Sequence, residues 1–305
     1  MAEITGSAPD IMEKYVTAKY WKQSKESKEC KTAICELCPH YCVIPADSKG
    51  STGKCGARTN INGTLIASSY GKVTSVALDP IEKKPLYEFY SGSFIVSIGS
   101  YGCNLSCPFC QNHNISLDYK SALTDNLSPE VILEIAMRSI PDKNIGVAYT
   151  YNEPLIGFEF ILDCFKLIRR AGLKNVLVTN GFINKEPLME LLPYVDAMNI
   201  DIKGNTKRTY NVVGGTPEHV KRTIELSYAH CHLEVTTLVV PGENEDEIEE
   251  IAKWIAKIDP KIPYHLSRFF PRFKYSDSTP TPIETMYKAK RDAERHLQKV
   301  YLGNM

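Results

Sequence analysis

From about residue 93 onward, short runs rich in β-branched and aromatic residues alternate with longer runs that have apolar residues at helical spacing. The short runs are typical of buried strands and the longer runs of amphipathic helices. The pattern predicts six strands, at residues 94–100, 144–151, 175–181, 196–204, 232–242 and 263–270. It predicts helices between and after them, at residues 128–141, 155–172, 185–195, 217–231, 245–259 and 285–300. Ser128 and Pro129 suit the start of the first helix, and Gly172 suits the end of the second.

Strands that alternate with helices form βαβ units, in which the strands are parallel and the crossovers right-handed. Six such units predict an α/β fold, an open (β/α)6 partial TIM barrel. A flat, doubly wound sheet is the alternative. In both architectures the functional site is expected at the carboxyl ends of the strands.

The first ninety residues have a different pattern. A Lys-rich stretch predicts a largely solvated helix at residues 10–30, whereas residues 31–92 are rich in Gly, Pro and Cys with short β-like runs. We therefore expect an N-terminal helix in 1–30, a Cys-rich metal-binding module in 31–92, the partial barrel in 93–284 and a C-terminal helix in 285–305.

Composition narrows the class of protein. The 36 basic and 36 acidic side chains balance, which argues against a dedicated nucleic-acid binder. No run approaches the roughly 20 apolar residues of a membrane span, and the N-terminal residues lack the apolar core of a secretory signal. We therefore expect a cytoplasmic protein without membrane partners. In that reducing compartment, ten cysteines indicate metal ligands or catalysis rather than disulfides.

Three of these cysteines follow the first predicted strand directly. Cys103, Cys107 and Cys110 are separated by three and two residues, on a loop with Gly99 and Gly102. Three thiolates at this spacing can bind three irons of a cubane cluster and leave the fourth iron open to another ligand. A zinc site completed by His113 is the alternative.

A second group lies near the start of the chain. Cys35, Cys38, Cys42 and Cys55 could form a closed tetrahedral zinc site or could hold a second iron–sulfur cluster; unmetallated thiols are the third interpretation. A small Gly-rich module has little core of its own, so a metal there would stabilise it. Cys30, Cys164 and Cys231 stand alone, and we expect no metal at them.

The CxxxCxxC loop, placed after the first strand of a (β/α)6 pattern, resembles the signature of the radical S-adenosylmethionine (SAM) superfamily. Longer segments resemble the AmmeMemoRadiSam-system branch of radical SAM proteins, which is close to the activating enzymes of glycyl radical enzymes such as pyruvate formate-lyase. These segments are DPIEKKPLYEFYSGS (79–93), GCNLSCPFCQNHNIS (102–116), AYTYNEP (148–154), EVTTLVVPGEN (234–244) and PYHLSRFFP (263–271). The resemblance runs from about residue 15 to 302, and CELCPHYC and GKCGAR also belong to the pattern of the branch.

The resemblance implies an oxidoreductase that works anaerobically with a [4Fe-4S] cluster on Cys103, Cys107 and Cys110. One electron from the cluster would cleave SAM to methionine and a 5′-deoxyadenosyl radical, which removes hydrogen from a substrate. Because no flavin or NAD motif is visible, the expected electron donor is flavodoxin or ferredoxin. A glycyl radical enzyme is the customary substrate. The alternatives are radical modification of a small molecule or of another protein and, outside catalysis, a metal-binding module.

The resemblance also implies residues that contact SAM. Phe109 stands where the loop meets the adenine, and Asn152 and Glu153 stand where the methionine amino group is bound, although Tyr151-Asn152 replaces two glycines of the family motif. Further candidates at strand ends are Asn180, Asp201, Lys203, Thr237, His265 and Arg268. His265 and Ser267 alternate with Leu266 and Arg268, so only one pair faces the barrel interior, and the pattern leaves open which.

Overall fold

The computed structural model describes residues 15–24, 31–46 and 50–305. The helix expected at 10–30 is wrong where it can be assessed, because Trp21–Gln23 form strand β1, which pairs antiparallel with β2 (Ala33–Cys35). Thr17 also bridges Ile66. Tertiary packing overrides the local pattern here: the neighbouring Tyr20 packs edge-on against the Phe158 ring at 5.2 Å. Residues 10–14 and 25–30 of the predicted helix, which include Cys30, lie outside the described residues.

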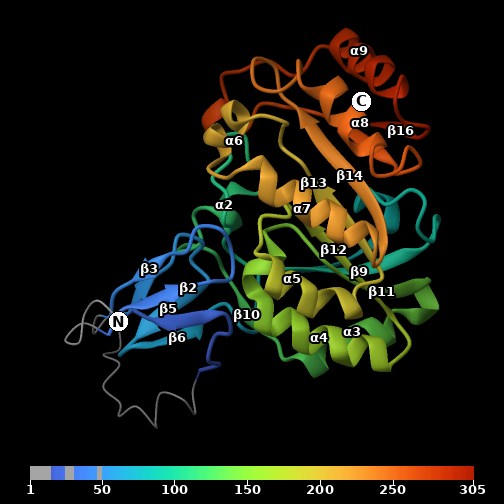
Figure 1. Cartoon of the computed structure of the whole chain (residues 1–305). Helices are drawn as coiled ribbons and strands as arrows, with labels where there is room; N and C mark the ends of the chain where they lie inside the picture. Colours follow the sequence, from blue (N-terminus) through green and yellow to red (C-terminus); the bar gives the residue numbers. More distant parts are fainter. Residues whose placement is uncertain (1–14, 25–30, 47–49) are drawn as a thin grey trace.

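The six predicted strands form the centre of an eight-stranded sheet (Figure 1). They are β9 (Phe94–Gly99), β11 (Asn144–Tyr149), β12 (Lys174–Thr179), β13 (Ala197–Asp201), β14 (His232–Val239) and β15 (Tyr264–Arg268). All six are parallel and pair in chain order. Two unpredicted strands extend the sheet: β8 (Ser75–Pro80) pairs antiparallel with β9, and β16 (Val300–Gly303) pairs parallel with β15. The mixed α/β architecture confirms the predicted fold class.

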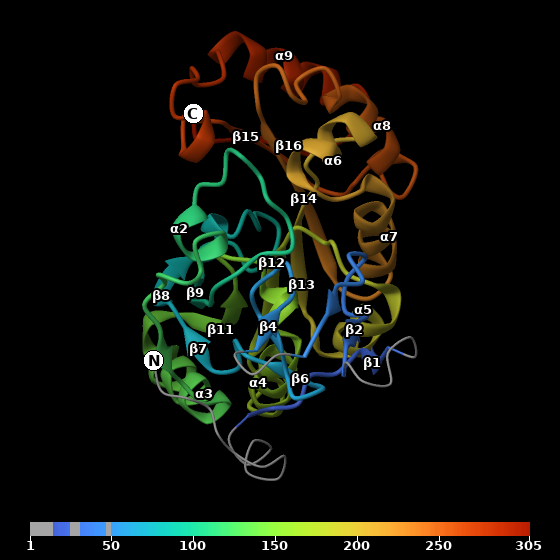
Figure 2. The ribbon, with the colours of Figure 1, turned by 90° about the vertical axis from the view of Figure 1, so that its left-hand side faces the viewer.

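The helices are α2 (His113–Ser116), α3 (Pro129–Arg138), α4 (Phe158–Arg170), α5 (Lys185–Leu191), α6 (Lys207–Val213), α7 (Pro217–Tyr228), α8 (Ile248–Ala256) and α9 (Ile283–Glu294). All but α2 and α6 cover the outer face of the sheet, and these two short helices lie at the carboxyl ends of the strands (Figures 1 and 2). As predicted, Ser128 caps α3 by accepting a hydrogen bond from the Val131 N–H at 3.4 Å. The main core lies between these helices and the sheet. No helix among the described residues is long and apolar enough to cross a membrane.

The C-terminal segment differs from the single helix expected over residues 285–305. Helix α9 ends at Glu294, and the chain then enters β16. The strand forms because β15 leaves an open edge, and Tyr301 stacks its ring on His265 at 5.3 Å.

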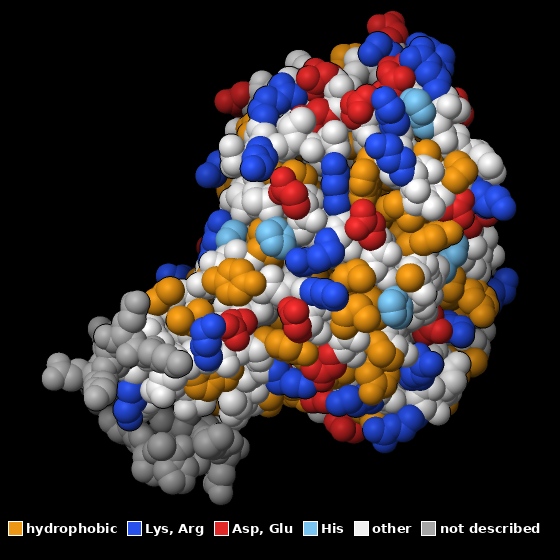
Figure 3. Space-filling model, in the orientation of Figure 1, with side chains coloured by type: hydrophobic (Ala, Val, Ile, Leu, Met, Phe, Trp, Pro, Cys, Tyr) orange, Lys and Arg blue, Asp and Glu red, His pale blue; other side chains and the backbone are white. Residues whose placement is uncertain are grey.

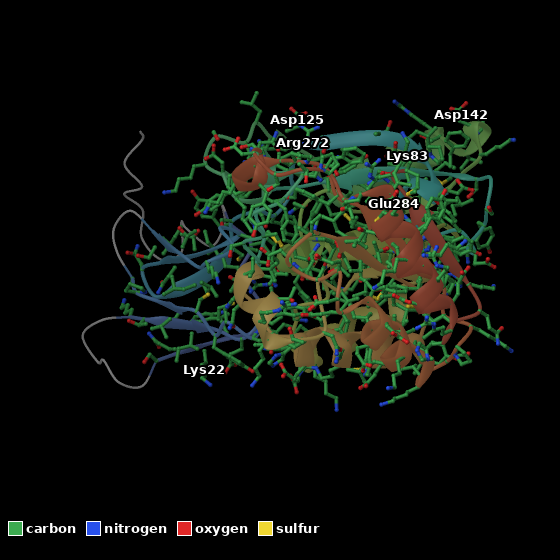
Figure 4. All side chains as sticks on the ribbon, turned by 90° about the horizontal axis from the view of Figure 1, so that it is seen from above. Lys22, Lys83, Asp125, Asp142, Arg272 and Glu284 are labelled. Carbon is green, nitrogen blue, oxygen red and sulfur yellow. The ribbon has the colours of Figure 1, made fainter. Side chains whose placement is uncertain are left out.

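Residues 81–93, which follow β8, cross the inner face of the sheet. The Asn199 side chain donates to the Pro85 carbonyl at 2.7 Å, and Glu234 accepts from the Tyr87 and Glu88 N–H groups at 3.1 and 2.8 Å. Lys299, next to the opposite edge strand, pairs with Glu88 at 2.6 Å. Figure 4 shows Lys83 of this segment on the side of the molecule away from Lys22 in the N-terminal strands. The segment assigned to the Cys-rich module by its sequence therefore fills part of the barrel interior.

Glu234 is the fully buried centre of this contact and pairs with His232 at 2.9 Å and His265 at 2.6 Å. Burial alone would raise the pKa of Glu234, but the hydrogen bonds from both histidines and from Glu88 lower it to about 2. A lowered folded-state pKa stabilises the fold above the unfolded pKa of 4.5, and this stability is lost as the pH falls towards 2.

We expect Glu234→Gln to lower the free energy of unfolding at pH 7 by about 2–3 kcal/mol and to flatten its fall between pH 4.5 and 2. Urea denaturation across this pH range measures both effects. Glu249→Gln is the matched control, because Glu249 also lies near a histidine (His296, 3.3 Å) but its side chain is 41% exposed. Equal effects of the two substitutions would contradict the role given to Glu234.

The N-terminal strands form two three-stranded sheets that lie beside the barrel (Figure 1). One contains β1, β2 and β3 (Val43–Ile44), and the other contains β4 (Ser51–Thr52), β5 (Arg58–Ile61) and β6 (Thr64–Ala67). A short ladder joins β7 (Lys72–Val73) and β10 (Asp125–Asn126). Arg58 in β5 forms a buried ion pair with Glu159 of α4 at 2.7 Å, which ties the two parts together. The visible face in Figure 3 carries interspersed basic and acidic side chains, in keeping with their equal numbers.

Candidate functional site: a cysteine loop at the carboxyl end of the sheet

The cysteine loop begins immediately after β9 and is held by contacts within and beyond it. The Gly102 N–H donates to the Ile115 carbonyl at 2.8 Å, and the Cys110 N–H to the Cys107 carbonyl at 3.2 Å. The Cys103 sulfur accepts from the Leu105 N–H at 3.4 Å and from the Asn180 amide at 3.6 Å. Burial raises the pKa of all three thiols, that of Cys107 to about 12, and the nearby Lys203 ammonium opposes the rise at Cys107 and Cys110.

Gly102 allows the loop to pass close to the N-terminal strands. Its φ of +86° lies in the left-handed region, and a Cβ there would come within 2.2 Å of the Cys55 carbonyl oxygen. The loop with Cys103 and the turn with Cys55 are therefore packed backbone to backbone.

Asn152 fastens the start of the same loop. Its side-chain oxygen accepts from the Ser100 N–H at 2.9 Å, and its amide donates to the Tyr101 and Gly102 carbonyls at 3.0 and 3.1 Å. The Asn152 oxygen therefore accepts one backbone hydrogen bond and keeps a second lone pair, so its contact with an ammonium stays a prediction. Tyr151 takes a left-handed φ of +71°, the conformation that a glycine at this position of the motif adopts easily.

Asn152→Ala should loosen the start of the cysteine loop at residues 100–102, because it removes the hydrogen bonds that hold their backbone. We expect a loss of about 1–3 kcal/mol of stability, because backbone partners lose their hydrogen bonds, together with a lower iron content after anaerobic reconstitution. Thermal unfolding and iron analysis measure the two effects. Asn112→Ala is the control, because the Asn112 side-chain amide donates one hydrogen bond here, to the Tyr151 carbonyl at 2.7 Å. Wild-type iron content in Asn152→Ala would contradict the positioning role.

Glu153 joins the ends of β11 and β12. One oxygen accepts from the Thr179 hydroxyl at 2.6 Å and the Leu155 N–H at 3.0 Å, and the other accepts from the Asn180 N–H at 2.8 Å. Burial raises the pKa of Glu153 to about 7 despite these donors. Burial and hydrogen bonding therefore act in opposite directions on the pKa of this carboxyl.

Asp201 ends β13, and Lys203 follows two residues beyond the strand, beside the cysteine loop. One Asp201 oxygen pairs with the Lys203 ammonium, while Oδ1 is buried and has no hydrogen-bond partner. The Asp201 and Cys107 charges raise the pKa of Lys203, although burial opposes this, so the ammonium stays charged. The pair offers a fixed cation and an unused acceptor oxygen.

A loop that the sequence did not single out covers the cysteines. The Lys274 N–H donates to the Pro108 carbonyl at 3.0 Å, and Tyr275 packs edge-on against Phe109 at 5.9 Å. Phe273 stacks on His113 at 4.6 Å with a φ of +52°. Phe109, only 5% exposed, is thus enclosed by this loop. Among the described residues, no three Cys, His, Asp or Glu side chains converge as ligands of a single ion, and the zinc alternative with His113 stays a prediction.

A second group that the sequence reasoning missed lies beneath Tyr151. The Tyr151 hydroxyl and the Lys84 ammonium both donate to Asp79 Oδ2, at 2.6 and 2.8 Å, and the ammonium lies 4.8 Å from the Tyr151 ring centroid. Lys84 is 2% exposed. The sequence signal for this group was the segment DPIEKKP (79–85). It contributed to the family resemblance, but no role was assigned to its residues.

Three expected contact residues lie elsewhere. Thr237 is fully buried and donates to the Ile202 carbonyl at 2.9 Å, and Arg268 donates to the Thr281 carbonyl at 2.7 Å. Both residues lie on the outer face of the sheet. Thr237 accepts a hydrogen bond from the Tyr264 hydroxyl, and Leu266, which shares a face of β15 with Tyr264 and Arg268, packs in the outer core. His265 and Ser267 are the pair that faces inward. His265 bonds Glu234 beneath the residue 81–93 segment rather than the cysteine loop.

The residues at the carboxyl edge fit an anionic iron–sulfur group with an organic cofactor beside it. Three thiols come from one loop, and amide donors reach Cys103 while the Lys203 cation lies near the other two. The unpartnered Asp201 oxygen supplies an acceptor at the same edge. Donors near sulfur and a fixed cation are the features that stabilise such a group.

Comparisons with known proteins agree with this geometry. The model of the Radical SAM superfamily matches residues 97–255, just over half of the chain. The uncharacterized protein MJ0808 of Methanocaldococcus jannaschii is 43% identical over 283 residues, 89% of this chain and 81% of that protein. Pyruvate formate-lyase 1-activating enzyme of Escherichia coli K12 is 24% identical over 220 residues, 65% of this chain and 88% of that enzyme.

Among solved structures, Streptococcus suis SuiB bound to S-adenosylmethionine has a similar fold, with a TM-score of 0.52 at 13% identity over 67% of this chain and 48% of that chain. The cysteine loop after the first parallel strand lies within the segment that the family model matches. The chain belongs to the radical SAM superfamily.

Proposed function

We propose that this enzyme activates a glycyl radical enzyme, with Cys103, Cys107 and Cys110 holding a [4Fe-4S] cluster and SAM bound at the carboxyl edge of the sheet. The cluster and SAM together would supply a 5′-deoxyadenosyl radical that abstracts hydrogen. The supporting observation is the juxtaposition of the three thiols with the Lys203 cation and the unpartnered Asp201 oxygen. The similarity to pyruvate formate-lyase 1-activating enzyme supports the choice of substrate.

The chain's own residues would orient and enclose the cofactor. Lys203, which pairs with Asp201, would bind the SAM carboxylate, and the unpartnered Asp201 Oδ1 would accept from a hydroxyl or ammonium of the same molecule. Phe109, Phe273 and Tyr275 form an aromatic cover that excludes water from the loop. A separate flavodoxin or ferredoxin would deliver the electron, since the sequence carries no flavin motif of its own.

The test is anaerobic co-incubation of the reduced protein and SAM with a glycyl radical enzyme from the same source. A glycyl radical doublet in the electron paramagnetic resonance spectrum is the expected result. A partner whose acceptor glycine is replaced by alanine is the control and should give no doublet. SAM cleavage without a doublet on any such partner would reject the activating role and would favour the alternative, modification of a small molecule or of another protein.

A further inference from the structure

Tyr151 has a backbone conformation that a glycine would adopt more easily. It lies two residues beyond β11, with a left-handed φ of +71°. A residue with a Cβ is strained in this region, and such strain persists only where the surrounding structure holds the residue in place. Strained residues of this kind gather at functional sites. The contacts of the Tyr151 side chain show what holds it.

The Tyr151 side chain extends from the carboxyl edge of the sheet to the edge strand β8. Its ring packs against Gly99, the last residue of β9, where an added Cβ would come within 2.9 Å of the ring carbon Cδ2. Its hydroxyl donates to Asp79 Oδ2 at 2.6 Å. Asp79 lies in β8 opposite Ile95 of β9, and its side chain is only 13% exposed. The tyrosine therefore connects the strained turn to a carboxylate inside the barrel.

Lys84, in the segment that crosses the inner face of the sheet, completes the group. Its buried ammonium donates to the same Asp79 oxygen at 2.8 Å and lies 4.8 Å from the centroid of the Tyr151 ring. Burial would raise the pKa of Asp79, but the hydrogen bonds from Lys84 and Tyr151 lower it to about 2. Burial also raises the pKa of Tyr151 to about 12. The hydroxyl therefore keeps its proton and donates it to a charged carboxylate, which makes a strong hydrogen bond.

Two contacts connect the turn at Tyr151 to the cysteine loop. The Tyr151 carbonyl accepts from the Asn112 side-chain amide at 2.7 Å, two residues after Cys110. The next residue, Asn152, accepts from the Ser100 N–H at 2.9 Å, at the start of the loop. The conformation of Tyr151 therefore affects both ends of the segment that carries the three thiols.

We propose that Asp79 and Lys84 are positioning residues of the SAM site and act through Tyr151. They hold Tyr151 in its left-handed conformation, and the turn then keeps the cysteine loop and the adjacent Glu153 carboxyl in place for the cofactor. This assignment rests on the proposed binding of SAM at the carboxyl edge of the sheet, but not on the choice of a glycyl radical enzyme as the substrate.

Tyr151→Phe tests the assignment, because it removes the hydroxyl and keeps the ring. In the reconstituted protein without SAM, we expect amide hydrogen exchange at residues 100–102 to become about tenfold faster, as the loss of one hydrogen bond to a charged group predicts. Exchange in α4 should stay at the wild-type rate. The KM for SAM in 5′-deoxyadenosine formation should rise about tenfold, while kcat should change by less than about twofold.

A second variant removes the whole group without leaving a buried charge unpaired. Asp79→Leu/Lys84→Met/Tyr151→Phe replaces the ion pair and the hydroxyl by apolar side chains, a change that folded proteins commonly tolerate. We expect the same faster exchange at residues 100–102 and the same rise in KM, at an unfolding temperature close to that of the wild type. Lys83→Met is the matched control and should behave as the wild type, because Lys83 lies 3.4 Å from the other Asp79 oxygen but is 67% exposed.

Wild-type exchange at residues 100–102 in either variant would overturn the proposal. An equal increase in α4 would also overturn it, because it would reveal a general loss of stability. Faster exchange at residues 100–102 with an unchanged KM for SAM would overturn the link to cofactor binding. If the wild type itself does not cleave SAM, the proposed function fails, and the exchange rates still decide whether Asp79 and Lys84 hold the loop.

Discussion

Cys107→Ala should abolish SAM cleavage and remove the cluster of the cysteine loop. Two thiolates cannot hold three irons. We expect the rate of 5′-deoxyadenosine formation to fall to the background of the reagents, a loss of more than about 100-fold. The iron content should fall by about four per chain.

Cys231→Ala is the matched control for this substitution. Cys231 is half-buried like Cys107, but it packs against the core beyond the end of α7, and its sulfur donates to the Ser227 carbonyl at 3.5 Å. This variant should keep the wild-type cluster and cleavage rate. Cleavage by Cys107→Ala at a rate close to that of the wild type would show that the loop does not hold the catalytic cluster.

Gly102→Ala should have the second largest effect, because it separates two backbones that the fold packs together. The left-handed φ costs about 1–2 kcal/mol for a residue with a Cβ, and the 2.2 Å approach to the Cys55 carbonyl adds an overpacking cost of about 1–3 kcal/mol. We expect a loss of about 3 kcal/mol in the free energy of unfolding, together with a lower iron content at the cysteine loop. Urea denaturation and iron analysis measure the two effects.

Gly92→Ala measures the cost of the left-handed backbone conformation by itself. Its φ of +80° is similar, but nothing lies within 4 Å of an added Cβ. This variant should lose only about 1 kcal/mol and should keep its iron. If both alanine variants behave alike, the close packing of the two cysteine segments does not govern cluster assembly.

Much of the barrel could be predicted because its signals are local. Parallel strands buried on both faces read as continuous apolar runs, and residues such as Ser128 and Gly172 carry their own capping preferences. The edge strands β8 and β16 were not assigned to the sheet, because they form by pairing with β9 and β15 rather than from a local signal. β8 follows the Gly-rich region with no helix between them. β16 follows α9, and the charge pattern of that helix predicted a helix instead of a strand.

The same distinction holds at the site. Asp201 and Lys203 were predicted to share a face of one strand; the two side chains do pair, although Lys203 lies two residues beyond the end of β13. Thr237 and Arg268 could not be assigned, because alternation along a strand does not reveal which face is inward until the neighbouring strands are in register. Asn152 shows a further limit: residue type indicated a polar contact, but only the fold reveals that Ser100, Tyr101 and Gly102 use it.

The central claim is that this chain cleaves SAM through a cluster on its cysteine loop. The most direct test is anaerobic incubation of the reconstituted protein with SAM and dithionite, followed by chromatographic measurement of 5′-deoxyadenosine and methionine. We expect both products in equal amounts from the wild type and neither from Cys107→Ala. A folded wild-type protein with a full iron complement that releases no 5′-deoxyadenosine would contradict the account.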